Sequence, residues 1–157
     1  FLSLFSGRNP DFLISKQVAA APLVKRLGLK VIPTGYLLIG TVSSASYMSN
    51  TTPIPYDKSD IAAATALAGE LMGHQAIYLD AGSGAEEPVR TEMIAEVKKS
   101  ISVPLIVGGG IKDFDSAYTL LEAGADILVV GNITEKNPQA IHEIAGAVTA
   151  MNKLNVH

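Results

Sequence analysis

Short apolar runs alternate with longer amphipathic stretches along most of the chain. Each run places several apolar residues in succession, as in a strand buried on both faces, and the stretches between the runs repeat apolar residues at helical spacing. In one such stretch a single helical face carries Ala62, Ala63, Ala66, Leu67 and Leu71. The pattern predicts strands at residues 1–5, 31–39, 76–80, 104–107 and 127–130, and helices at 10–27, 59–72, 89–99, 113–122 and 138–151.

Local signals mark some of these boundaries. Gly28 is expected to end the first helix, and Ser59 or Asp60 to cap the second. Segment 40–58 has no clear period. In a compact domain, a connection of this length is either a lid or binding loop, or a sign that its elements are assigned wrongly.

Five strands alternating with five helices predict a parallel sheet covered by helices. Two architectures accept this order: a doubly wound open sheet, and the second part of a TIM-type (β/α)8 barrel. Glycines follow three consecutive strands, at 82 and 84, at 108–110 and at 131. Barrels commonly bind phosphate after their seventh and eighth strands, so the glycines favour the barrel. The interpretation is a single domain, 1–157, that holds strands 4 to 8, with strands 1 to 3 before residue 1.

Composition narrows the function classes. The 157 residues carry a net charge of −3 and no cysteine. The charge gives no basic surface for nucleic acid, and the missing thiols exclude disulfides and thiolate chemistry. This fits a cytoplasmic protein. Residues 31–56 contain no charge, but their prolines and glycines would break a transmembrane helix.

The glycine-rich strand ends are candidates for phosphate binding. Backbone amides converge on an anion at such ends, and glycine lets the ligand approach closely. The alternative is that each glycine only makes a tight turn between strand and helix. Ser83 and Asn132 add side-chain donors at the same ends.

Asp80 is the candidate catalytic residue. It ends its strand on the face where barrels place their chemistry, and its carboxylate can accept hydrogen bonds from a polyol or take a proton from a hydroxyl. An ordinary capping carboxylate is the alternative. Tyr78 lies two residues earlier and points to the same side, either to pack in the barrel or to donate to a ligand. Lys112 reads as a helix-start charge, and the histidines show no metal-binding spacing.

Several motifs resemble the family of geranylgeranylglyceryl phosphate synthase and its heptaprenylglyceryl relatives. They are SGRNPDFLI, VIPTGYLLI, YLDAGSGA, PLIVGGGI and VVGN, and they occur in the family's order along essentially the whole chain. The resemblance implies a TIM-type barrel that transfers a polyprenyl group from its diphosphate to the C3 hydroxyl of sn-glycerol 1-phosphate in ether-lipid biosynthesis. It implies Mg²⁺ on the diphosphate, a homo-oligomer and transient contact with a membrane.

The resemblance also implies roles for particular residues. Asp80 would orient or deprotonate the attacking hydroxyl, although many relatives have Glu there. The magnesium ligands of the family lie on its first two strands, so none is expected in this chain. The residues implied to hold sn-glycerol 1-phosphate are Tyr78, Asp80, Ala81, Gly82, Ser83, Gly84, Gly109, Gly110, Gly131 and Asn132.

Two other functions fit the residues without the resemblance. One is another phosphate-binding TIM-barrel isomerase or synthase that acts on a small phosphorylated substrate. The other is a non-catalytic phosphate-binding half-barrel.

Overall fold

A computed structural model describes residues 2–4 and 11–154, and this part of the chain holds one parallel sheet of five strands. The strands lie side by side in chain order, from β1 to β5, and every neighbouring pair is parallel. Their bounds are β1 Leu2–Leu4, β2 Thr34–Leu38, β3 Ala76–Asp80, β4 Leu105–Gly108 and β5 Ile127–Val129.

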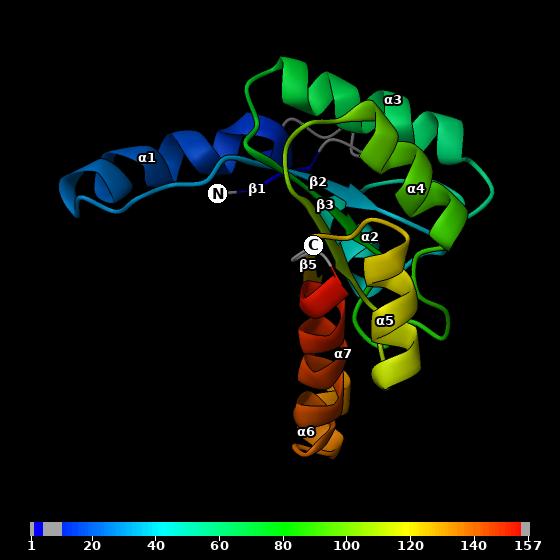
Figure 1. The fold of residues 1–157 in the computed structure, drawn as a ribbon. Coiled ribbons are helices and arrows are strands. Elements are labelled where there is room, and N and C mark those ends of the chain that lie inside the picture. The colour runs from blue at the N-terminus through cyan, green and yellow to red at the C-terminus, as the bar shows by residue number, and fades with distance from the viewer. Residues whose placement is uncertain (1, 5–10, 155–157) are drawn as a thin grey trace.

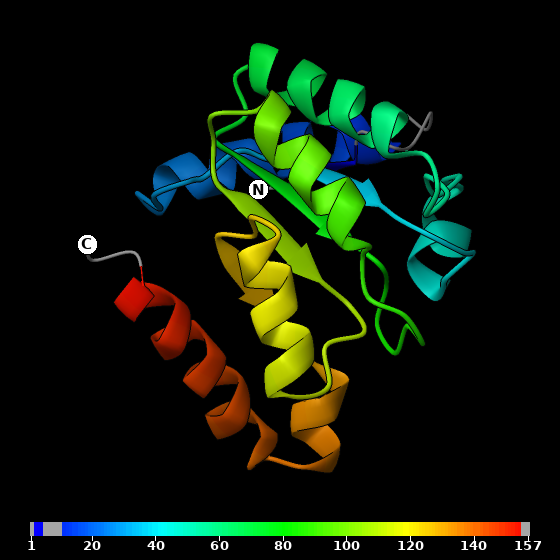
Figure 2. The ribbon, with the colours of Figure 1, turned by 45° about the vertical axis from the view of Figure 1, so that its right-hand side comes forward.

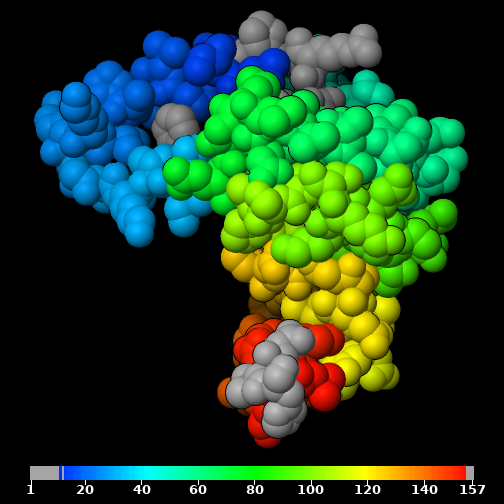
Figure 3. All heavy atoms as spheres, turned by 45° about the horizontal axis from the view of Figure 1, so that its top comes forward, coloured from blue at the N-terminus to red at the C-terminus, as the bar shows by residue number. Residues whose placement is uncertain are grey.

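The helices connect these strands. Figures 1 and 2 show α3, α4, α5 and α7 following one another along one side of the sheet. Figure 3 shows the blue segment that contains α1 projecting beyond the rest of the molecule. The bounds are η1 Asp11–Ser15 (a π-helical turn), α1 Lys16–Arg26, α2 Ser44–Ser49, α3 Ser59–Leu71, α4 Thr91–Ser100, α5 Phe114–Glu122, α6 Asn132–Lys136 and α7 Ala140–Leu154.

The strand order decides between the two predicted architectures. A doubly wound sheet reverses its strand order at a switch point and carries helices on both faces. Here the order does not reverse, and the succession of helices lies on one side. The fold is therefore part of a TIM-type barrel, as predicted, and the doubly wound alternative is wrong. The numbering of these strands as 4 to 8 stays a prediction.

The two faces of the sheet differ in chemistry. Ile77 and Leu79 face the helices and are fully buried in the main hydrophobic core, together with the alternate residues of β2 and β4. The other face carries Tyr36, Tyr78 and Asp80, and the strand register pairs Tyr36 with Tyr78 and Asp80 with Gly108. Polar groups thus gather on the inner face, toward the carboxyl ends of the strands.

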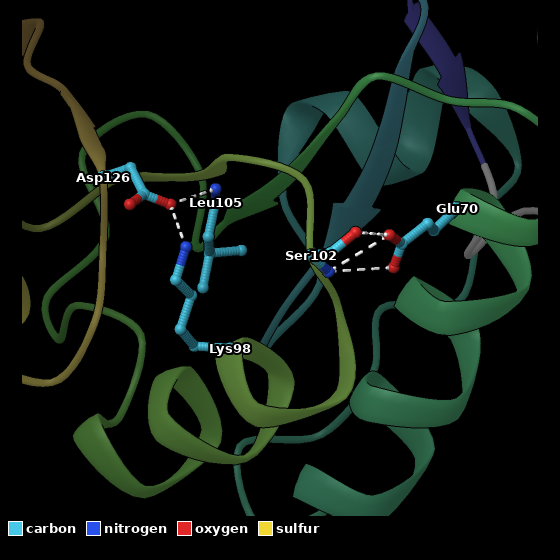
Figure 4. Close-up of polar contacts among 5 residues, drawn as sticks. All are labelled: Glu70, Lys98, Ser102, Leu105 and Asp126. Atoms are coloured by element: carbon cyan, nitrogen blue, oxygen red, sulfur yellow. Dashed lines mark hydrogen bonds and ion pairs between the residues drawn. The ribbon is translucent and has the colours of Figure 1, made fainter.

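Two carboxylates secure the amino ends of β4 and β5 (Figure 4). Asp126 accepts a hydrogen bond from the Leu105 amide at 2.7 Å and forms an ion pair with Lys98 at 2.6 Å. Glu70 accepts from the Ser102 amide with both oxygens, at 3.1 Å each, and from the Ser102 hydroxyl. These contacts join neighbouring β/α units at the edge opposite the glycine-rich ends.

The amphipathic face of α3 is narrower than predicted. Ala62, Ala63 and Ala66 are buried, but the side chain of Leu67 is 39% exposed and that of Leu71 is 79% exposed. Gly69 takes the fourth buried position. Because small residues line this face, α3 packs closely on its neighbour α4, and both leucines stay exposed.

Some helix ends also differ from the prediction. The N-cap of α3 is Lys58, so Ser59 and Asp60 are already helical. Gly28 ends α1 with φ +63°, as predicted. Residues 1 and 5 of the first predicted strand lie outside the described residues.

Two short helices lie where no helix was predicted. Segment 40–58 contains α2, which starts with a capping box between Ser43 and Ser46. Ile54 of the same segment forms a parallel bridge with Ile39, just after β2. Helix α6 begins at Asn132, before the predicted last helix. Helices of five or six residues are too short to show a helical period in the sequence.

Candidate active site

A cleft of about 400 Å³ lies across the carboxyl ends of β3, β4 and β5. The structure brings nearly all of the sequence-predicted site residues together on its walls. They are Tyr78, Asp80, Gly82, Ser83, Gly84, Gly109, Gly110, Gly131 and Asn132. That they bind a ligand stays a prediction. The tenth residue, Ala81, is buried, donates its amide to the Gly108 carbonyl at 2.9 Å and borders the neighbouring cleft.

The glycines of the cleft serve two different purposes. A Cβ at Gly109 would lie 2.7 Å from the Gly82 carbonyl oxygen, and one at Gly110 would lie 2.6 Å from the nitrogen of Pro88. Both glycines also have positive φ, so tight turns and close packing explain them. Gly131 differs, because a Cβ there would meet nothing within 4 Å. Its missing side chain leaves open space in the cleft.

The carboxylate of Asp80 is held from two sides. The Gly82 amide donates to Oδ1 at 2.8 Å, and the Tyr36 hydroxyl donates to Oδ2. Sequence reasoning placed Tyr36 in mid-strand but gave it no role. Its contact with Asp80 depends on the register between β2 and β3, which no local pattern reveals.

Two tyrosines pack beside this carboxylate. The rings of Tyr36 and Tyr78 meet edge to face, with centroids 5.0 Å apart. Burial raises the pKa of Tyr36, and its hydrogen bond to Asp80 raises it further. Burial also raises the pKa of Tyr78, as does the nearby charge of Asp80. Both hydroxyls are therefore protonated donors at neutral pH.

Gly108 makes room for one of these rings. A Cβ at Gly108 would lie 2.5 Å from the Tyr78 hydroxyl oxygen. The first glycine of the triplet therefore accommodates Tyr78.

A hydrogen bond joins a loop to a helix start at the edge of the cleft. The Ser83 hydroxyl donates to the side-chain oxygen of Asn132 at 2.6 Å. The absence of a side chain at Gly84 leaves space for the Asn132 amide, because a Cβ there would lie 3.0 Å from its nitrogen. The loop after β3 and the start of α6 are thus joined by two of the predicted phosphate donors.

Two lysines line the same cleft. Lys112 follows the glycine triplet, and its ammonium group donates to the Glu86 carbonyl at 3.0 Å. Lys136 reaches the cleft from the end of α6. Sequence reasoning read Lys112 as a helix-start charge and did not consider Lys136, although both follow a glycine-rich strand end within a few residues. They give the cleft positive charge in a chain whose net charge is −3.

A second cleft, of about 630 Å³, adjoins the first. Its walls are the uncharged residues 41–44, the ring of Tyr56 and residues 81–87. The Tyr56 hydroxyl donates to the Glu87 carbonyl at 3.1 Å, and burial raises the pKa of Tyr56. Gly40 lets this ring approach, since a Cβ there would lie 2.5 Å from it. The clefts share residues 82–85 as a common wall.

The described residues form neither a metal-binding cluster nor a membrane-spanning helix. Within residues 2–4 and 11–154, no three carboxylate or imidazole side chains lie close enough together to hold a metal ion. In the same part of the chain, no helix has the length and apolar character needed to span a membrane.

Five consecutive β/α units with a glycine-rich cleft at their carboxyl edge define a protein of the TIM-barrel class. The chain belongs to the PcrB family, which it matches over residues 1–148. This confirms the family resemblance found in the sequence.

Three relatives illustrate the similarity. A protein of Spirosoma linguale named geranylgeranylglyceryl phosphate synthase is 54% identical over 154 residues, which are 97% of this chain and 62% of that protein. The structure of (S)-3-O-geranylgeranylglyceryl phosphate synthase from Thermoplasma acidophilum, in complex with its substrate sn-glycerol-1-phosphate, is 29% identical with a TM-score of 0.90, and the match covers 97% of this chain and 62% of that one. Wild-type GGGPS from Thermoplasma volcanium is 34% identical with a TM-score of 0.87, over 94% of this chain and 59% of that one. The chain thus spans about three fifths of the length of these relatives.

Proposed function

We propose that the protein transfers a geranylgeranyl or similar polyprenyl group from its diphosphate to the C3 hydroxyl of sn-glycerol 1-phosphate, for ether-lipid biosynthesis. The observation that carries the proposal is the cleft, where the Asp80 carboxylate faces the same space as the glycine-rich strand ends and two lysines. The relative from Thermoplasma acidophilum, whose fold matches this chain closely, binds sn-glycerol 1-phosphate.

The cleft offers separate groups for the two ends of glycerol phosphate. The open space at Gly131 admits a phosphate to the backbone, with Asn132 and Lys136 beside it. Asp80 and Tyr78 lie on β3 and suit the hydroxyl end. The ligand would therefore lie across the ends of β3 to β5.

In the proposed step, Asp80 accepts a hydrogen bond from the C3 hydroxyl. The hydroxyl oxygen forms a bond to C1 of the prenyl group while the bond from C1 to the diphosphate oxygen breaks, and the proton leaves toward Asp80. Two donors already hold the carboxylate, so it needs little reorganisation before reaction. An allylic carbon tolerates partial positive charge, so the hydroxyl need not be fully deprotonated before it attacks. Positioning of the hydroxyl therefore contributes to the rate along with the base strength of Asp80.

We also propose that the reaction depends on Mg²⁺, which would neutralise the diphosphate leaving group. The residues described here do not form a metal site of their own. The proposal predicts that a chelator abolishes turnover and that added Mg²⁺ restores it.

The second cleft has one uncharged wall that suits an apolar substrate segment, and Glu86 and Glu87 line another part of it. Residues 41–44 in its wall carry no charge, and the side chain of Val42 is 76% exposed. We propose that the first isoprene units of the prenyl diphosphate lie here, beside the shared wall at 82–85. The exposed apolar side chains of α2, Tyr47 and Met48, support transient contact with a membrane.

Homo-oligomerisation and a cytoplasmic location remain proposals as well. Large apolar side chains are exposed on two helices, and burying such surface favours association. They are Val18 and Leu23 on α1 and Ile61 and Leu71 on α3. Light scattering on the intact protein tests the first proposal, and cell fractionation tests the second.

The experiment that tests the function uses the intact protein, geranylgeranyl diphosphate, Mg²⁺ and radiolabelled sn-glycerol 1-phosphate. We expect labelled ether product in the organic phase, and little product from sn-glycerol 3-phosphate. If sn-glycerol 1-phosphate binds but no ether forms with any prenyl diphosphate, the transferase proposal is wrong. A phosphate-binding barrel of another function would then remain.

A further inference from the structure

We infer that Tyr36 is a positioning residue for Asp80, and that its hydroxyl holds the carboxylate in the orientation that prenyl transfer requires. The inference rests on the proposed function and adds a residue to it. Tyr36 lies on β2, one strand away from Asp80, and it does not line either cleft among the described residues. Its hydroxyl donates to Oδ2 of Asp80, so this contact acts on a ligand by way of the carboxylate.

The strand register explains how the two side chains meet. Tyr36 is paired with Tyr78, and Leu38 with Asp80, so Tyr36 lies on the inner face one alternate position before Asp80. A long side chain reaches diagonally across neighbouring strands from such a position. The hydroxyl at the end of the ring thus arrives at Oδ2.

The Asp80 carboxylate is fixed only if both of its oxygens are held. The Gly82 amide donates to Oδ1, two residues along the chain, and this contact resists rotation from one side only. Tyr36 supplies the second contact from a different strand. With both present, the plane of the carboxylate is set, and its remaining lone pairs are available to the cleft.

The Tyr36 hydroxyl is itself held in place. Its ring packs edge to face against Tyr78, and Tyr78 in turn lies over Gly108. The raised pKa of Tyr36 keeps the hydroxyl protonated, so it donates throughout the neutral range. This arrangement makes a rigid donor, which suits positioning better than proton transfer.

The first test is Tyr36→Phe in the intact protein, which removes one oxygen atom and keeps the ring contact. Tyr118→Phe is the matched control, because Tyr118 stacks on Phe114 in α5, away from the cleft. Misplacing a reacting group by about 1 Å costs about 10²-fold, so we expect kcat to fall by about 10–100-fold. The KM for sn-glycerol 1-phosphate and the thermal stability should stay near those of the wild type, and the control should change neither kinetic constant.

A double-mutant cycle separates positioning through Asp80 from general packing. In an Asp80→Asn background the carboxylate is gone, so Tyr36→Phe should lower kcat by less than about 3-fold. An equal loss in both backgrounds would overturn the inference, as would a wild-type kcat for Tyr36→Phe. An inactive wild-type protein would instead overturn the proposed function and the inference together.

Discussion

Gly131 allows the phosphate site to be tested without disturbing the fold. Of the five glycines that line the cleft, it alone has negative φ, and a side chain there would meet no atom within 4 Å. Replacing it with Ala puts a methyl group into open cleft space. The free energy of unfolding should change by less than about 1 kcal/mol, as at other sites where no contact is broken.

The same methyl group should impair binding of sn-glycerol 1-phosphate. It holds the phosphate away from the backbone amides at the start of α6, and a hydrogen bond to a charged group contributes about 1.5–3 kcal/mol. Losing one such bond weakens affinity by about 10–100-fold, because each 1.4 kcal/mol is tenfold. Titration calorimetry on the intact protein measures this change, and a thermal melt measures stability.

Two other glycines serve as controls for Gly131→Ala. Gly109→Ala combines positive φ with a 2.7 Å approach to a backbone oxygen, so it should lower stability by about 1–3 kcal/mol. Gly146→Ala lies inside α7, in ordinary contact with Phe114 at 3.7 Å, and should raise stability by about 0.5–1 kcal/mol without changing affinity. Wild-type affinity in Gly131→Ala would refute the assignment of the phosphate to this end of the cleft.

Three further substitutions test the catalytic, electrostatic and structural roles. Asp80→Asn should lower kcat by about 10²–10⁴-fold, the usual worth of a general base, while affinity for sn-glycerol 1-phosphate is largely kept; lost affinity with unchanged kcat would make Asp80 a binding group only. Lys136→Gln should weaken the affinity for sn-glycerol 1-phosphate by about 3–10-fold in dilute buffer. The effect should be smaller at 1 M salt, because charges are then screened beyond about 3 Å. An effect that does not depend on salt would count against an electrostatic role of Lys136. Asp126→Ala leaves the Leu105 amide and Lys98 without their acceptor, so chemical denaturation should show a loss of about 1–3 kcal/mol, with affinity unchanged.

The strands were predictable because their apolar runs are continuous and glycines follow them directly. The positions of the strands then indicated which loops meet. The residues that follow the ends of β3, β4 and β5 could therefore be assigned to one edge of the sheet before any contact was known. The buried face of α3 was predicted less well. The helical period shows which residues share a face, but not how much of that face the neighbouring helix α4 covers. Leu71 matched the period and is exposed.

The details of the site required the structure for two reasons. The contact of Tyr36 with Asp80 depends on how β2 and β3 align, and alignment is a property of the pair of strands. The difference between Gly109 and Gly131 depends on which atoms surround each of them. In the sequence, Gly109 and Gly131 are each a glycine after an apolar run. A turn-forming role and a ligand-binding role fit the two positions equally well.

The sheet has a secured amino edge and a ligand-facing carboxyl edge, and this division would separate variants in a genetic screen. Substitutions at Asp126 or Glu70 loosen the joints between β/α units, so cells would hold less of the protein, with the remaining molecules fully active. Substitutions at Gly131 would leave abundance normal and reduce activity per molecule. Substitutions at Gly109 would lower abundance, as those at Asp126 and Glu70 do, although Gly109 lines the cleft. The reason is that the neighbouring atoms leave no room for a side chain there. Measuring abundance and activity in parallel would thus distinguish two glycines whose variants look alike when activity alone is scored.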